Sequence, residues 1–281
     1  MMQDVFQNFC EKIELDNDII LKIKNIMNKI TKCVDDYYET STAKKRSQFI
    51  GSYGRNTAVY VENIRVLVVL PSVLYMQLSL DIGNILLDLK KSLLSEFSAC
   101  EFGEHGNSIW INIDGDLSFQ VIPGFEFDNG VYLYWENNEW KRLNLYNEKA
   151  VFNEVNSKYN NNLIHLCRML KVWKNQHDIS ISNILLDTFA YHFFNMAVSK
   201  SYMYENYDEM VRDFFDFLLP NCIKENFISI DGTTILERKV DIKDKVFTAS
   251  SKAATAIEVS KHGDYNGALD DWKFIFGHYY M

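Results

Sequence analysis

Prolines are scarce in this sequence, with only 3 in 281 residues, and no stretch is rich in glycine and serine. Flexible linkers are built from such residues, so the sequence gives no sign of a tethered, independently moving segment. No apolar run approaches the roughly 18 residues that a membrane-spanning helix needs, and the N-terminus is polar and helical rather than basic and then apolar. We therefore expect a folded, cytoplasmic protein that does not bind membranes.

Cysteine and histidine patterns typical of metal sites are also missing. The 5 cysteines are scattered and never spaced as C-x-x-C, which argues against a disulfide framework and a zinc site, and the 6 histidines show no H-x-x-x-H spacing. A formal charge of −9 opposes non-specific binding to DNA, because long-range repulsion works against phosphate contacts. Any phosphate-bearing ligand must therefore be held by a local site.

Hydrophobic residues make up 47% of the chain, which is enough for a large core. From Asn17 to Tyr38 they recur at helical spacing, which predicts a long amphipathic helix with Asp16 or Asn17 as its N-cap. The continuous apolar run from Val66 to Leu70, closed by Pro71, predicts a strand that is covered on both faces.

The remaining patterns predict a sheet followed by helices. Asp114-Gly115 favours a hairpin turn between strands at 108–113 and 117–122. Further elements are expected as a helix at 80–97, a strand at 131–135 and helices at 163–174, 182–198, 210–218 and 250–261. The fold class is therefore α+β: residues 1–150 form a mixed sheet with a long spine helix, and residues 151–281 form a helical lobe packed on it.

The segment from Phe49 to Ala58 reads FIGSYGRNTA and carries the most chemical information. A strand that runs into Gly51-Ser52, with Gly54 before a helix, lets backbone N–H groups and a serine hydroxyl approach a phosphate, and the helix N-terminus adds favourable partial charge. A strand-turn-helix connection with glycines for steric reasons explains the same residues equally well.

With its surroundings, this segment resembles the bacterial cGAS/DncV-like nucleotidyltransferases, which make cyclic di- and trinucleotide second messengers in anti-phage defence. The resemblance covers most of the chain and implies a polymerase-β-like nucleotidyltransferase core. It rests on six blocks in the same order: the Gly-Ser segment, the strand 66–70, VIPGF at 121–125, LCRMLKVWK at 166–174, ISNILLDT at 181–188 and WKFIFG at 272–277.

Members of that family carry an acidic pair, spaced i and i+2, about a dozen residues after the Gly-Ser, and a third acidic residue on a later strand. Residues i and i+2 of a strand share one face, so a neighbouring strand can bring the third carboxylate beside them to hold two Mg²⁺. The matching residues here are Asn63, Arg65 and Gln120. The resemblance therefore implies a catalytic site that has lost its carboxylates.

No other acidic residue restores the missing triad. Glu62 adjoins Asn63 and should face the other way, whereas Asp116 is four residues, roughly 13 Å, from Gln120. Neutral amides are weak ligands for Mg²⁺, and Arg65 adds a fixed positive charge. We expect no catalytic residue, no metal and no other cofactor, with Mg²⁺ needed only if the chain is an inactivated form of an active synthase.

The resemblance implies two further phosphate contacts, at Lys171 and Ser182. In the family, a lysine on the equivalent helix and a serine at the start of the next helix contact the triphosphate. The alternative is that Lys171 and Lys174 form a solvated helix face and that Ser182 is only an N-cap.

Four other candidates are suggested by their positions in the sequence. Ser52 is expected to contact phosphate, and Arg65 can either pair with phosphate directly or form a salt bridge with a nearby carboxylate. Tyr134 either stacks on a nucleobase or packs in the core. The basic cluster 44–46 can bind a polyanion or lie in a solvated loop.

These observations predict a catalytically degenerate homologue of a cyclic-oligonucleotide synthase that binds a nucleotide, an oligonucleotide or a partner protein in a defence pathway. The alternative is an active nucleotidyltransferase that makes cyclic di- or trinucleotides from NTPs, present here in an inactivated form.

Overall fold

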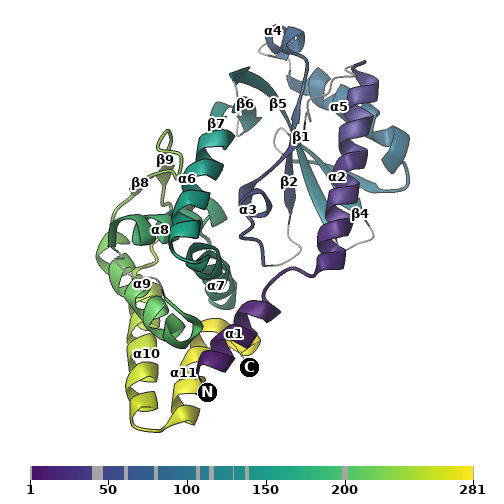
Figure 1. The fold of residues 1–281 in the computed structure, drawn as a ribbon. Coiled ribbons are helices and arrows are strands. Elements are labelled where there is room, and N and C mark those ends of the chain that lie inside the picture. Colours follow the sequence, from purple (N-terminus) through teal and green to yellow (C-terminus); the bar gives the residue numbers. More distant parts are fainter. Residues whose placement is uncertain are drawn as a thin grey trace. The chain divides into compact units, whose positions relative to one another are not determined.

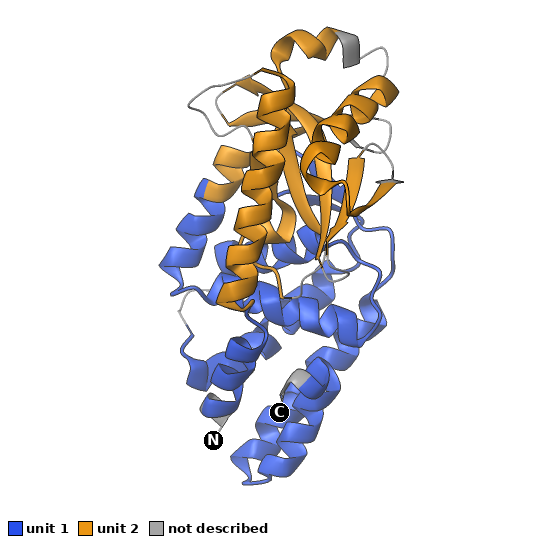
Figure 2. Ribbon diagram, turned by 90° about the vertical axis from the view of Figure 1, so that its right-hand side faces the viewer, with its two compact units in different colours: residues 1–14, 150–281 blue, residues 15–149 orange. Residues whose placement is uncertain are grey.

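The chain divides into two compact units in the computed structural model, residues Leu15–Lys149 and residues Met1–Glu14 with Ala150–Met281 (Figures 1 and 2). We expected residues 1–150 to form one unit, but the first 14 belong to the helical unit. No helix of the described residues is long and apolar enough to cross a membrane. The structure describes residues 2–39, 47–59, 63–78, 82–105, 108–113, 117–128, 130–136, 139–197 and 202–280.

In the unit Leu15–Lys149, seven strands of the described residues form one mixed sheet, as predicted. The central pair β2 and β5 is parallel, and the other pairs are antiparallel. The main strand order is β1-β2-β5-β4-β3, and β6 joins β5 to β7. The strands are β1 (Ser47–Ile50), β2 (Ile64–Val69), β3 (Glu101–His105), β4 (Ser108–Ile113), β5 (Leu117–Asp128), β6 (Val131–Glu136) and β7 (Glu139–Asn144).

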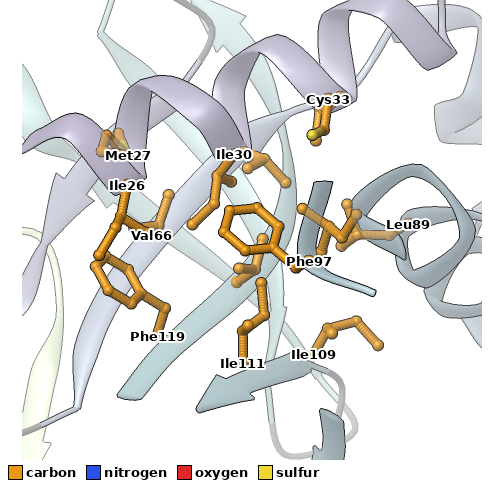
Figure 3. Packing of buried hydrophobic residues seen from close by; sticks show 14 of the residues in the cluster. Ile26, Met27, Ile30, Cys33, Val66, Leu89, Phe97, Ile109, Ile111 and Phe119 are labelled. Carbon is orange, nitrogen blue, oxygen red and sulfur yellow. The ribbon is translucent and has the colours of Figure 1, made fainter. Parts of the chain in front are cut away.

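Helices α2 (Asn17–Tyr37) and α5 (Ile82–Phe97) cover one face of this sheet (Figure 3). The predicted long helix is confirmed, and the Asp16 carboxylate caps it by accepting the Asp18 N–H at 2.7 Å. Strand β2 is buried on both sides, since Val66 packs beneath α2 and Leu67 packs into a second cluster on the opposite face. Short elements of this unit are α3 (Gly51–Gly54), η1 (Ser72–Leu74) and α4 (Tyr75–Leu78).

The second unit is mainly helical, as predicted. Its N-terminal helix inserts Phe6 and Phe9, both fully buried, against Trp272 and Phe276, which explains why residues 1–14 belong here. Helix α6 runs from one unit into the other. The elements are α1 (Met2–Lys12), α6 (Leu145–Lys158), α7 (Asn162–Gln176), α8 (Asn183–His192), the π-helix η2 (Phe193–Ala197), η3 (Tyr204–Asn206), α9 (Tyr207–Asn221), β8 (Asn226–Ile228), β9 (Ile235–Glu237), α10 (Lys243–Lys261), α11 (Tyr265–Phe276) and η4 (Gly277–Tyr280).

Candidate functional site

Two of the three positions matched to the metal-binding triad face each other on adjacent strands. Arg65 of β2 is the register partner of Gln120 of β5, and its Nε donates to the Gln120 Oε1 at 3.1 Å. The Gln120 Nε2 donates in turn to the Ser108 Oγ on β4 at 3.0 Å. A hydrogen-bonded chain from guanidinium to amide to hydroxyl therefore runs across three strands.

These hydrogen-bonded side chains lie on the face of the sheet opposite α2 and α5. Side chains alternate along a strand, and the neighbours Val66 and Val121 are fully buried in the cluster beneath those helices. The side chains of Arg65 and Gln120 are half-buried on the other face. Asn63 directly precedes β2 and is exposed. The two substitute carboxylates considered from the sequence, at positions 62 and 116, lie outside the described residues.

The Gly-Ser turn lies against Arg65. Ile50 pairs with Arg65 across β1 and β2, and a Cβ built on Gly51 would lie 3.6 Å from the Arg65 Cδ. Gly51 has a φ of +69°, which favours glycine. Gly54 is required for space, because a Cβ there would come within 2.5 Å of the Phe49 carbonyl oxygen. The turn therefore brings the Gly51 backbone against the aliphatic part of the Arg65 side chain, with Ser52 next in the chain.

The helix predicted after Gly54 does not form there, since residues 55–59 are turn and coil. The helical element here is the four-residue α3, which contains Gly51 and Gly54 themselves, so few peptide dipoles add at its N-terminus. The turn is instead held by backbone bonds, in which the Thr57 N–H donates to the Ser52 carbonyl at 2.9 Å and the Arg55 N–H donates to the Gly51 carbonyl at 3.1 Å.

A buried ion pair anchors this turn to α6, and the sequence did not reveal it. The Arg55 Nη1 lies 3.0 Å from the Glu148 Oε1, with side chains only 4% and 9% exposed. The two residues are 93 positions apart, so local patterns carry no signal of their pairing. Arg55 is thereby a positioning residue for the Gly-Ser turn.

Lys171 does not lie on a solvated helix face, so that alternative was wrong, whereas its contact with a phosphate stays a prediction. Its ammonium is 3% exposed and forms an ion pair with Asp187 of α8, which is 0% exposed. The neighbouring Lys174 is half-buried and donates to the Asn183 Oδ1 at 2.9 Å. Ser182 is the N-cap of α8, accepting the Leu185 N–H, and its role as a phosphate contact stays a prediction.

Tyr134 packs against the small apolar cluster that contains Leu67 and Ile122. The core-packing alternative therefore describes this side chain better than base stacking does. The basic cluster 44–46 lies outside the described residues.

The side chains of Asn63, Arg65 and Gln120 are not suitable ligands for Mg²⁺. The three positions that the resemblance matches to the family's carboxylates hold two amides and a guanidinium, and a divalent ion beside Arg65 would be repelled by it. Among the described residues, no group of three His, Cys, Asp or Glu side chains could hold a metal ion. These residues can instead bind an anion, since guanidinium, hydroxyl and backbone N–H groups all donate hydrogen bonds to phosphate oxygens.

Comparison with known proteins gives the family. Residues 1–156, more than half of the chain, match the model of the Second Messenger Oligonucleotide or Dinucleotide Synthetase domain, abbreviated SMODS. The chain belongs to the SMODS family. The resemblance to cGAS/DncV-like nucleotidyltransferases noted from the sequence is confirmed.

The SMODS assignment agrees with one curated relative and several solved structures. A probable cyclic nucleotide synthase of Bacillus cereus (strain VD146) is 23% identical over 175 residues, which cover 58% of this chain and 51% of that protein. The chain thus matches about half the length of this relative.

Among solved structures, Escherichia coli MS115-1 CdnC in complex with HORMA-deltaN has a TM-score of 0.79 and 13% identity, covering 100% of this chain and 98% of CdnC. Vibrio cholerae DncV cyclic AMP-GMP synthase with nonhydrolyzable GTP has a TM-score of 0.74 and 14% identity, and the match covers 96% of this chain and 93% of DncV. At these identities the structural likeness shows the fold, and it confirms the predicted α+β nucleotidyltransferase architecture.

Proposed function

We propose that this SMODS-family protein is a catalytically degenerate synthase homologue that binds a nucleotide without metal-assisted chemistry. The observation that supports the proposal is the bond from Arg65 to Gln120, two positions that the resemblance matches to carboxylates of the family. Phosphoryl transfer by this family needs charge neutralisation and alignment by metal ions, and these side chains cannot hold them.

The same residues support retained phosphate binding. The guanidinium of Arg65 supplies the positive charge that Mg²⁺ would bring, and its Nε bond to Gln120 fixes the plane of the guanidinium. The Gly51 backbone lies against the Arg65 side chain, and Ser52, the next residue, could add a hydroxyl and a backbone N–H group. Phosphate, guanidinium and serine would then form a metal-free anion site.

The relatives support the ligand class and the possibility of a protein partner. DncV was solved with nonhydrolyzable GTP, CdnC with ATP, and CdnC in another structure with a HORMA protein. We infer that this chain binds a nucleotide or short oligonucleotide and acts as a regulator or sensor, with or without a protein partner, in an anti-phage defence pathway.

The proposal is tested by incubating the protein with all four ribonucleoside triphosphates and either Mg²⁺ or Mn²⁺, and measuring pyrophosphate and cyclic products. We expect no pyrophosphate above background. Steady production of any cyclic di- or trinucleotide would contradict the loss of catalysis, and would support an active synthase instead. Calorimetry with the same nucleotides in EDTA tests binding separately from chemistry.

A further inference from the structure

The row formed by Arg65 and Gln120 continues onto a third strand. Trp110 of β4 is the register partner of Gln120, so its side chain projects from the same face of the sheet. Neighbouring strands lie about 4.8 Å apart, which places the backbones of Arg65 and Trp110 about 10 Å apart. A cationic side chain and a large aromatic ring thus lie on one surface, with an amide between them.

On β3, the residue opposite Trp110 is a glycine. This residue, Gly103, has no side chain to cover the ring, and a Cβ there would lie 3.6 Å from the Trp110 Cβ. The residues flanking Trp110 on its strand, Ile109 and Ile111, are fully buried on the opposite face, whereas Trp110 itself is half-buried. The indole is therefore on the site face, not in the core beneath α2.

The indole N–H of Trp110 is not satisfied. Its Nε1 is buried and has no hydrogen-bond partner among the described residues. Buried tryptophans usually place this donor against an acceptor, and an unsatisfied one in a native structure needs an explanation. A ring held here despite that cost points to a role other than packing.

Polar groups flank the ring along the strands. Asn112 pairs with Ser118, two residues further along β4 and β5, and therefore lies on the same face as Trp110. The Asn112 side chain is exposed, and its Nδ2 contacts the Glu101 Oε2 at 3.5 Å. Amide, hydroxyl and carboxylate groups beside an aromatic ring match the donors and acceptors on the edge of a nucleobase.

We propose that Trp110 is a stacking platform for the base of a nucleotide whose phosphates lie at Arg65 and Ser52. This rests on the proposed function and adds the position of the base. A phosphate alone, or an acidic peptide, would use only the cationic end of the row, whereas a nucleotide uses the cation, the ring and the polar edge together. The chain's formal charge of −9 favours a small nucleotide over a long nucleic acid.

The test compares ligands with and without a base. Calorimetry in EDTA measures the affinity of each ribonucleoside triphosphate and of tripolyphosphate for the wild type, Trp110→Ala, Trp110→Phe and Arg65→Gln. We expect Trp110→Ala to weaken nucleotide binding about 5- to 150-fold, which is the range that corresponds to the loss of one stacked base. The affinity for tripolyphosphate should change by less than about twofold. Trp110→Phe should keep most of the nucleotide affinity, and Arg65→Gln should weaken the binding of both nucleotides and tripolyphosphate.

A fluorescence measurement covers the case in which Trp110→Ala does not fold. Adding nucleotide should quench tryptophan emission in the wild type, and Trp110→Phe should abolish that quenching. Trp140→Phe is the matched control, because Trp140 packs against Tyr75 and Phe125 and should leave the quenching intact.

Different results overturn different parts of the account. If Trp110→Ala binds nucleotides with wild-type affinity while Arg65→Gln weakens their binding, the platform is wrong and the proposed phosphate site stands. If Trp110→Ala weakens nucleotides and tripolyphosphate equally, its role is structural. If the wild type binds neither ligand, both the platform and the proposed function are wrong.

Discussion

The burial of Lys171 predicts a large effect on stability rather than on ligand binding. Both partners of its ion pair with Asp187 are almost fully buried, at 3% and 0% exposure, so the pair belongs to the regime of buried ions. Lys171→Met removes the cation that faces a buried carboxylate, which costs about 3 to 5 kcal/mol. Such a loss is a large fraction of the roughly 5 to 15 kcal/mol that stabilises a typical protein.

Urea unfolding followed by circular dichroism measures this cost. Lys174→Met is the matched control, because Lys174 lies on the same helix and its partner, Asn183, is neutral, so we expect a loss below about 1.5 kcal/mol. Replacing both ions, as Lys171→Met with Asp187→Leu, should recover most of the stability, because no charge is then left buried.

Lys171→Met with near wild-type stability but weakened nucleotide binding would refute this reasoning. Lys171 would then face a ligand, as the sequence first suggested.

Three further predictions concern other residues. Burial lowers the pKa of His165 from 6.5 to about 4. As the pH falls from about 6.5 towards 4, the unfolded chain therefore binds a proton at His165 that the folded chain does not bind, and up to roughly 3 kcal/mol of stability should be lost. Urea unfolding at several pH values should show this loss for the wild type and a much smaller one for His165→Gln. Gly54→Ala should destabilise by about 1 to 3 kcal/mol because the new Cβ meets the Phe49 carbonyl, whereas Gly103→Ala, which makes an ordinary contact, should change stability by less than about 1 kcal/mol, as thermal melts can check. Ser52→Ala should weaken triphosphate binding by roughly 1 kcal/mol in calorimetry without lowering the melting temperature, and an unchanged affinity would remove Ser52 from the site.

Local patterns predicted the elements whose signals are local. The long helix with its Asp16 cap, the strand from Val66 to Leu70 and the hairpin flanking positions 114 and 115 follow from periodicity and turn residues, and the structure confirms all three. The resemblance implied that a neighbouring strand brings Gln120 close to Arg65, and the observed register makes them direct partners on β2 and β5.

What the sequence could not show depends on contacts between distant residues. One alternative from the sequence placed Lys171 and Lys174 on a solvated face, but Lys171 is buried against Asp187 of the next helix. Likewise, β7 lacks an apolar alternation and becomes a strand by pairing with β6. Trp110 belongs to no sequence motif, and only the strand register, which pairs it with Gln120, makes it a candidate for the site.

The central claim is that a guanidinium has replaced the metal site, and the Mg²⁺ dependence of triphosphate binding tests it most directly. Calorimetry on the wild type should give affinities in Mg²⁺ and in EDTA that agree within about threefold and that fall with salt, since Arg65 supplies the charge itself. The combined variant Asn63→Asp, Arg65→Asp and Gln120→Asp should instead bind triphosphate more tightly with Mg²⁺ than without it. Wild-type affinity that rises tenfold or more on adding Mg²⁺ would contradict the account.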